Sequence, residues 1–245
     1  MGDFFPPDAV VRRVDGEAVL LLGGGRALLM QLAHPMVARG VAEHSQFEAD
    51  PFSRLQRTLD AVTTIVFGTE DEARQVAAVV GAVHQGVTGD GYRANDPELL
   101  LWVHATLVDT ALRVHARFLR PLREDQAERY YAESMHIAEL LGVPRDLQPP
   151  DLAAFRAYVR MMVGSLEVTD EARRVADAVF HPRAIVLQPA FLLARELTAG
   201  LLPAPLRRGF QLSWDPPRQA VLLAAALACR SVLPRVPSRL RRVPV

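Results

Sequence analysis

Apolar residues recur along this chain at intervals of three and four, between short stretches rich in Pro and Gly. This spacing is typical of amphipathic helices, and alternation of apolar and polar residues over the length of a strand is rare. The pattern predicts an all-α fold, a single globular multi-helix domain over residues 1–245 with a Pro- and Arg-rich tail at about 233–245. A chain of this length can bury one sizeable core.

Helix start and stop signals divide the chain into segments. The predicted helices are 26–39, 51–67, 69–86, 96–119, 124–141, 152–163, 171–179, 185–199 and 216–233. The clearest start is Asp96-Pro97-Glu98, with Asp as N-cap and Pro at the first helical position. His34-Pro35 predicts a kink or an end in the first helix, because proline lacks an N–H donor. Segment 89–95 is predicted to be a loop and the tail an extended strap or a weak anion-binding segment.

Composition removes several classes of function. All 28 basic residues are Arg and they balance 28 acidic residues, so no global charge indicates a nucleic-acid partner. The absence of Lys excludes Schiff-base chemistry and a phosphate-loop lysine. Without that lysine, Gly23-Gly24-Gly25 is interpreted as a tight turn. The single Cys229, the lack of a secretory signal and apolar runs of at most ten residues predict a cytoplasmic protein without a transmembrane segment.

Seven histidines carry the candidate chemistry, and two of them occupy positions where a helical pattern would place Leu. His84 ends the run Val79–His84, and His104 ends the run Leu99–His104. A buried imidazole must satisfy both ring nitrogens, through hydrogen bonds or a metal. For one histidine alone, a hydrogen-bonded core residue is the favoured interpretation. Several together on apolar helices raise the alternative of a buried haem site.

Other patterns are less informative. Arg54, Arg57 and Thr58 share one face of the helix from Pro51, which is either solvated or directed at a polar ligand such as dioxygen or a propionate. Spacing alone favours the solvated face. Glu133 and His136 form half of a di-iron signature, but the sequence holds no second Glu-x-x-His, so a ferritin-like site is not expected.

Several segments taken together resemble one known family. They are Gly23-Gly-Gly-Arg-Ala-Leu-Leu-Met-Gln-Leu-Ala-His34-Pro35, Gly40-Val-Ala-Glu-His44-Ser, Arg54-x-x-Arg57-Thr58, Tyr92-Arg93-Ala-x-Asp96-Pro97-Glu98, Trp102-Val-His104-Ala-Thr-Leu-Val-Asp109 and Tyr130-Tyr131-x-Glu133. The combination is similar to the rubber oxygenases (latex-clearing proteins) and MpaB-type oxygenases, from about residue 10 to 235. Each short motif alone is unspecific.

The resemblance implies an all-α fold around a b-type haem, with one proximal histidine and a distal Arg-x-x-Lys-Thr helix. By order along the chain His84 matches the proximal ligand and metal-binding residue. His104 is the main rival, and His34 and Arg54 are further cofactor-binding candidates. Arg54, Arg57 and Thr58 are the catalytic candidates. Arg57 replaces the family's lysine, and because arginine has no lone pair for iron, we expect a distal position that is open or water-bound, with Arg57 donating a hydrogen bond to bound dioxygen.

The expected function is a haem-dependent oxygenase that uses dioxygen on a small hydrophobic substrate, with an unidentified electron donor if one is needed. Rubber oxygenases are secreted, so polyisoprene is not the expected substrate. Two alternatives are a non-catalytic haem-binding or sensing protein and a structural all-α protein without cofactor. The three differ in whether the purified protein is coloured and whether it consumes dioxygen.

Overall fold

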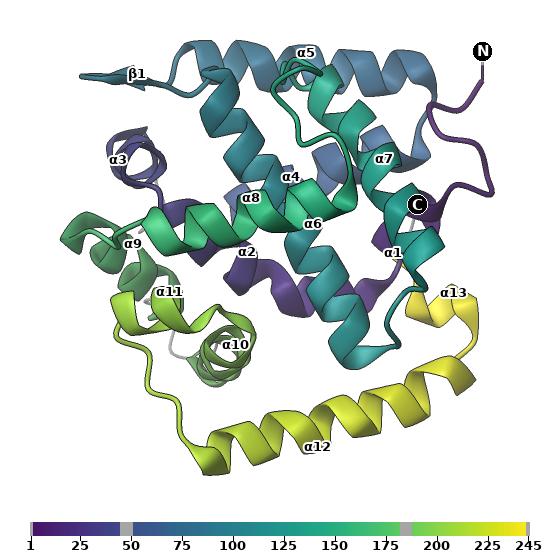
Figure 1. Ribbon diagram of the computed structural model, residues 1–245, viewed down its shortest axis with the longest axis vertical. Coiled ribbons are helices and arrows are strands. Elements are labelled where there is room, and N and C mark those ends of the chain that lie inside the picture. The colour runs from purple at the N-terminus through teal and green to yellow at the C-terminus, as the bar shows by residue number, and fades with distance from the viewer. Residues whose placement is uncertain (1, 45–50, 182–187, 244–245) are drawn as a thin grey trace.

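The computed structural model describes residues 2–44, 51–181 and 188–243, and for 51–55, 238 and 240 the backbone alone. Most of these residues are helical, which confirms the predicted all-α class (Figure 1). The helices are α1 (Val10–Asp15), η1 (Ala18–Gly23), α2 (Gly24–Leu32), α3 (Pro35–His44), α4 (Pro51–Phe67), α5 (Glu70–Gln85), α6 (Pro97–Phe118), α7 (Glu124–Leu140), α8 (Leu152–Ser165), α9 (Asp170–Phe180), α10 (Gln188–Leu201), α11 (Ala204–Gly209), α12 (Pro216–Val232), η3 (Leu233–Arg235) and α13 (Ser238–Arg241). Strands β1 (Thr88–Gly89) and β2 (Tyr92–Arg93) form a small antiparallel hairpin.

Helix α6 forms the centre of the molecule and contacts η1, α1, α2, α7, α8 and α12. It begins as predicted, because the Asp96 carboxylate accepts a hydrogen bond from the backbone N–H of Glu98 at 2.9 Å. Trp102 on this helix is fully buried, and its indole N–H donates to the carbonyl of Met30 at 3.1 Å. The main core therefore surrounds α6, and the α2 and α6 helices are joined across it.

Helices α4 and α5 form an antiparallel hairpin that turns at Gly68 and Thr69. Thr69 and Glu72 make a reciprocal cap, in which the Thr69 N–H donates to the Glu72 carboxylate at 2.8 Å and the Glu72 N–H donates to the Thr69 hydroxyl. Both helices agree with the predicted 51–67 and 69–86. Since the two helices run in opposite directions, the last turn of α5, with His84, lies toward the beginning of α4.

The glycines before α2 are helical, so the predicted tight turn is wrong. Gly23 ends η1, and Gly24 and Gly25 begin α2. A Cβ atom at Gly25 would stand 2.1 Å from the hydroxyl oxygen of Thr198, and one at Gly23 would stand 2.5 Å from a methyl group of Thr110. These residues are glycine because α10 and α6 approach the backbone closely, a contact between distant segments that spacing cannot reveal.

One other prediction needs correction. The loop predicted at 89–95 overlaps the β1–β2 hairpin, which begins at Thr88 and is closed around Gly91, whose φ of +79° favours glycine. The kink or end predicted at His34-Pro35 is confirmed, since α2 ends at Leu32 and α3 starts at Pro35, where proline lacks the N–H donor. The predicted start of helix 185–199 lies outside the described residues, and the described helix α10 starts at Gln188.

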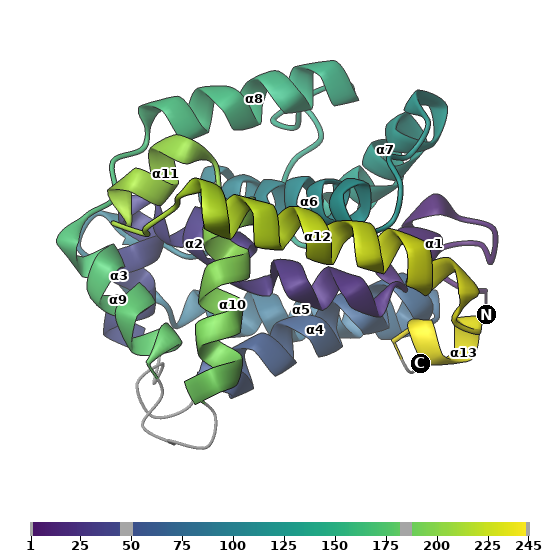
Figure 2. The same cartoon turned by 90° about the horizontal axis from the view of Figure 1, so that it is seen from below.

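The C-terminal segment returns to the N-terminal part of the chain (Figure 2). Helix α12 lies across one side of the bundle, and the chain continues through η3 and α13. The Val243 N–H donates to the Gly16 carbonyl at 2.9 Å, and Arg242 forms a β-bridge with Glu17. The tail lies over the surface in helical turns rather than in the extended form predicted. Among the described residues, no helix has the length and apolar character needed to cross a membrane.

Candidate functional site

His34 lies at the break between α2 and α3 and is half-buried. Its Nδ1 atom is buried and has no hydrogen-bond partner among the residues that the structure describes. Burial lowers the pKa of His34, although the nearby carboxylates of Asp96 and Glu98 act in the opposite direction. The imidazole is therefore neutral near pH 7 and lies close to the N-terminal end of α6. A buried nitrogen without a partner is a rare and costly feature that an additional ligand would relieve.

His84 lies in the last turn of α5, one turn after Gly81, and is half-buried. The side-chain amide of Asn95 donates to the Gly81 carbonyl at 3.1 Å, and Asn95 immediately precedes the cap of α6. The C-terminal end of α5 is thereby fixed against the N-terminal end of α6. His34 and His84, 50 positions apart in the sequence, thus lie on segments that meet at the same end of α6.

The predicted polar face of α4 is only partly described. Arg57 and Thr58 are exposed, as the solvated-face interpretation requires. The side chain of Arg54 lies outside the described residues, and only its place in the first turn of α4 is known. The direction of the α4–α5 hairpin brings this first part of α4 toward the end of α5 that carries His84.

His104, the rival ligand, occupies a different environment. It is fully buried on α6, and burial lowers its pKa to about 4, against a hydrogen bond to the backbone of Ser134 on α7. Its Nε2 atom is buried without a hydrogen-bond partner in the described part of the chain. The ring is neutral at physiological pH and its bonded side faces α7. The structure therefore separates His104 from His34 and His84, which lie on segments that meet the end of α6.

The remaining four histidines each have a partner, which for three of them is close in sequence. Their bonds are His44 Nε2 with the Thr88 carbonyl at 3.0 Å, His115 Nδ1 with the Arg120 carbonyl at 2.7 Å, His136 with Glu139 at 3.5 Å, and His181 with Asp177 at 2.9 Å. Glu133 accepts a hydrogen bond from the Val11 N–H at 2.7 Å and so joins α7 to α1. No group of three or more metal-ligating side chains occurs in the described part of the chain.

A buried ionic network that was not predicted from the sequence links α2, α6 and α10. The guanidinium of Arg26 on α2 donates to the Asp109 carboxylate and the Thr110 hydroxyl on α6, each at 2.6 Å, and to the Leu201 carbonyl on α10 at 3.0 Å. The Arg26 side chain is only 3% exposed. In the sequence, Arg26 and Asp109 are opposite charges within apolar helical segments. Because they lie far apart in the sequence, their spacing does not indicate that they pair. The network fixes three helices relative to one another.

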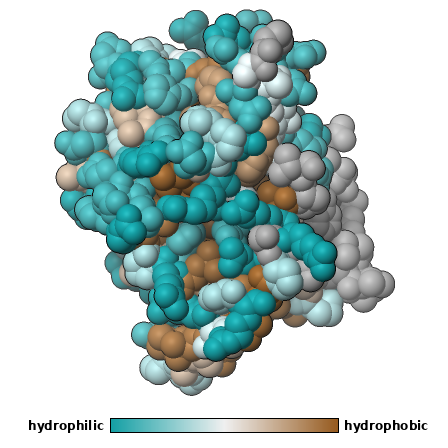
Figure 3. Space-filling model, turned by 90° about the vertical axis from the view of Figure 1, so that its right-hand side faces the viewer, coloured by the Kyte–Doolittle hydropathy of each residue, from teal (hydrophilic) through white to brown (hydrophobic). Residues whose placement is uncertain are grey.

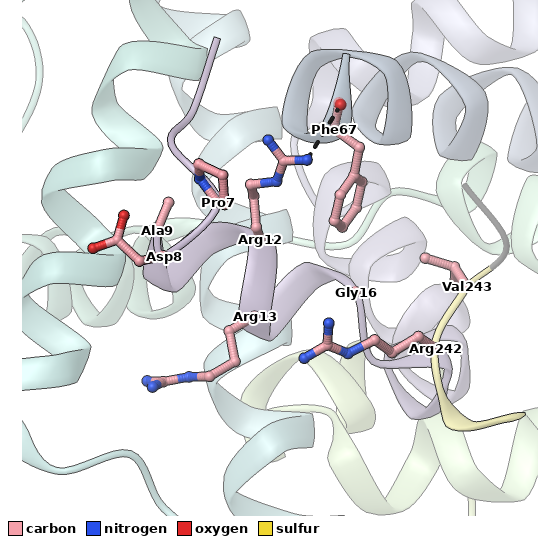
Figure 4. Close-up of a pocket in the computed structure, with 9 residues that line it drawn as sticks. All are labelled: Pro7, Asp8, Ala9, Arg12, Arg13, Gly16, Phe67, Arg242 and Val243. Atoms are coloured by element: carbon pink, nitrogen blue, oxygen red, sulfur yellow. Dashed lines mark hydrogen bonds between the residues drawn. The ribbon is translucent and has the colours of Figure 1, made fainter. Parts of the chain in front are cut away.

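A cavity of about 540 Å³ opens beside α1, at the end of the molecule where the chain termini meet (Figure 4). It is lined by Pro7, Asp8, Ala9, Arg12, Arg13, Gly16, Phe67, Arg242 and Val243. Arg12 is held there by Asp3 at 2.7 Å and by the carbonyl of Phe5, and its guanidinium lies over the ring of Phe67. Among the described residues, His34, His84, His104, Arg57 and Thr58 do not line this cavity.

Comparison with known proteins supports one family. The family described as ER-bound oxygenase mpaB/B'/Rubber oxygenase, catalytic domain, matches residues 11–231. Two uncharacterized proteins, from Mycobacterium tuberculosis and Mycobacterium bovis, are each 30% identical to this chain over 207 residues, which cover 78% of this chain and 80% of theirs. No solved structure matches the chain significantly.

Proposed function

Because the chain belongs to the family of mpaB and rubber oxygenase catalytic domains, we propose that this oxygenase depends on haem b and acts on a small hydrophobic substrate with dioxygen. The observation that carries the proposal is that His34 and His84, both half-buried, lie on segments distant in sequence that approach the same N-terminal end of α6. Neutral imidazole is a common axial ligand of haem iron, so the donor chemistry of these residues fits the group.

His84 is proposed to bind the haem iron, and His34, whose Nδ1 has no hydrogen-bond partner among the described residues, is the proposed second contact to the cofactor. Haem, when bound, supplies the activation of dioxygen. The protein's own contribution is orientation and polarity. Arg57 carries a permanent positive charge and several N–H donors, so it can hold a polar ligand but cannot take up its proton. Arg54 and Thr58 are proposed to act with it from the same helix.

The decisive measurement is an absorption spectrum of the full chain, purified after expression with added haem precursor. We expect a Soret band that His84→Ala strongly reduces and that His136→Ala leaves unchanged, because His136 is exposed and bound to Glu139. Adding imidazole to His84→Gly should restore the band. Colourless wild-type protein with normal helix content, or an unaltered spectrum in His84→Ala, contradicts the assignment.

The replacement of the family's lysine by Arg57 is tested separately. The ferric wild-type protein should show a high-spin spectrum, and Arg57→Lys should shift it toward low spin, because lysine can offer a lone pair to the sixth position. Dioxygen uptake with a panel of small apolar compounds then distinguishes an oxygenase from a protein that only binds haem. A low-spin wild-type spectrum with two strong nitrogen ligands would contradict the predicted open position.

A further inference from the structure

Helix α12 lacks the polar outer face expected of a helix on the surface of a bundle. Residues 220–229 are all non-polar, yet only one side of the helix packs on α6 and α10, through the buried Leu222 and Ala226. Val221 is 70% exposed, and Leu223, Leu227 and Val232 are between 42% and 58% exposed. We call these four residues the α12 face. A helix covered on one side only should carry polar residues on the other.

Figure 3 shows hydrophobic residues, interrupted by hydrophilic ones, at the lower end of the molecule, which is where α12 lies in Figure 1. Isolated exposed apolar residues are normal on a protein surface. Four on one helix, three of them within the non-polar run 220–229, are not scattered residues, and such patches mark contact surfaces.

The same segment carries a strong positive charge. Residues 216–245 contain six Arg and no Asp or Glu, whereas residues 1–215 contain 22 Arg and 28 acidic residues. Arg235, Arg239 and Arg242, which follow α12, are exposed. Arg218 and Arg241 already have acidic partners, Glu196 and Glu17. A chain of net charge zero therefore concentrates its positive charge next to its apolar helix.

A second group of cations adjoins the C-terminal end of the α12 face. Arg113 and Arg117 on α6 and Arg230 on α12 form no ion pair with a carboxylate among the residues described here. Burial lowers the pKa of Arg117, and the charges of Arg113 and Arg230 lower it further, so both of these guanidinia lie near Arg117. The positive charge thus continues onto α6 beside α12.

The area and the charge of the α12 face indicate which kind of partner it binds. A 17-residue helix offers a face roughly 26 Å long and about 10 Å wide, or about 260 Å², against about 800 Å² for each partner of a stable dimer. A second copy would also bring together two segments of the same charge. An anionic lipid surface needs only shallow insertion of the apolar face, and its phosphates complement the arginines.

We propose that the α12 face lies in the interface of a bilayer that contains acidic phospholipids, with Arg235, Arg239 and Arg242 bound to headgroup phosphates. The long arginine side chains extend from the apolar face toward the headgroups while their stems stay in apolar contact. Guanidinium groups bind phosphate oxygens through paired hydrogen bonds. The proposal concerns the surface of the protein and does not depend on a bound haem.

The test is cosedimentation of the full chain with vesicles of phosphatidylcholine alone and of phosphatidylcholine with phosphatidylserine. We expect binding to the mixed vesicles, weakened by salt, and at least tenfold weaker binding to the neutral ones. Leu227→Asp should lower binding to the mixed vesicles at least tenfold. The matched control is Met161→Asp on α8, since Met161 and Leu227 are equally exposed at 59% and 58%. The double variant Arg235→Gln/Arg239→Gln should lose binding, and Arg145→Gln/Arg160→Gln should not.

Each other outcome overturns the proposal. Absence of binding to both vesicle types by folded protein excludes a lipid surface. Equal losses in Leu227→Asp and Met161→Asp would show that the α12 face has no special part. A dimer in light scattering that Leu227→Asp dissociates, without vesicle binding, assigns the face to a second copy. Retention of an acidic peptide without vesicle binding assigns it to a protein partner.

Discussion

The buried pair of Arg26 and Asp109 makes an asymmetric prediction about stability. Asp109→Asn leaves the Arg26 guanidinium, 3% exposed, without its counter-charge. Arg26→Met leaves the Asp109 carboxylate, which is 25% exposed and can regain contact with water. Burial lowers the pKa of Arg26 while Asp109 raises it, because the carboxylate favours the charged form that burial disfavours. Removing the Asp109 carboxylate should therefore destabilise the protein more than removing the Arg26 guanidinium.

The expected magnitudes follow from this difference. Removing one partner and leaving the other charge buried costs about 3–5 kcal/mol, which we expect for Asp109→Asn. This corresponds to a fall in Tm of roughly 6–20 °C for a chain of this size. Arg26→Met keeps an apolar stem of similar length and leaves a charge that water can reach, so we expect a smaller loss of about 1–3 kcal/mol.

Urea unfolding followed by circular dichroism measures both variants. The control is Glu124→Gln, which breaks the surface pair of Arg156 and Glu124, whose N–O distance of 2.7 Å is similar but whose side chains are 43% and 67% exposed. It should change the free energy of unfolding by less than about 1 kcal/mol. The reasoning is refuted if Asp109→Asn loses no more stability than Glu124→Gln, or less than Arg26→Met.

Two further predictions concern pH and close packing. Burial lowers the pKa of His104 from 6.5 to about 4, so between these values the unfolded chain binds a proton that the native chain does not. The native state should lose roughly 3 kcal/mol as the pH falls through this window. Urea titrations above and below the window should show this loss in wild type but not in His104→Leu, and parallel curves would contradict it. Gly25→Ala should cost about 1–3 kcal/mol, because its Cβ meets Thr198, and Thr198→Ala should restore part of that loss. Gly164→Ala, with no atom within 4 Å of its Cβ, should instead gain about 0.5–1 kcal/mol in unfolding experiments. A neutral Gly25→Ala would show that the helices can move apart.

Local signals in the sequence predicted most of the helices because their causes are local. The Asp96 cap and the reciprocal cap of Thr69 and Glu72 involve residues two or three positions apart, and both form as the spacing indicates. Pro35 separates α2 from α3 for an equally local reason, its missing N–H. The short helices α1, α11 and α13 were missed because four to six residues give too little periodicity to recognise.

Contacts between distant segments could not be predicted in this way. Gly25 looks like a turn residue until Thr198 is placed against it, and Arg26 looks like a surface charge until Asp109 and Leu201 surround it. Each is explained by a partner more than 80 positions away. Periodicity identifies which face of a helix is buried but not which helix covers it. The predicted tight turn at Gly23-Gly24-Gly25 was a reasonable local interpretation of a tertiary feature.

Contacts between distant segments also decide which histidine is the better candidate for binding the cofactor. Sequence placed His84 and His104 in one class, because both follow apolar runs. The structure distinguishes them by their neighbours, since His104 is bonded to α7 whereas His84 and His34 lie on segments that meet the N-terminal end of α6. The absorption spectra of His84→Ala and His104→Ala therefore test two different places for the cofactor. Loss of the Soret band only in His104→Ala would move the cofactor to the α6–α7 side, and Arg57 on α4 would then have no part in its distal environment.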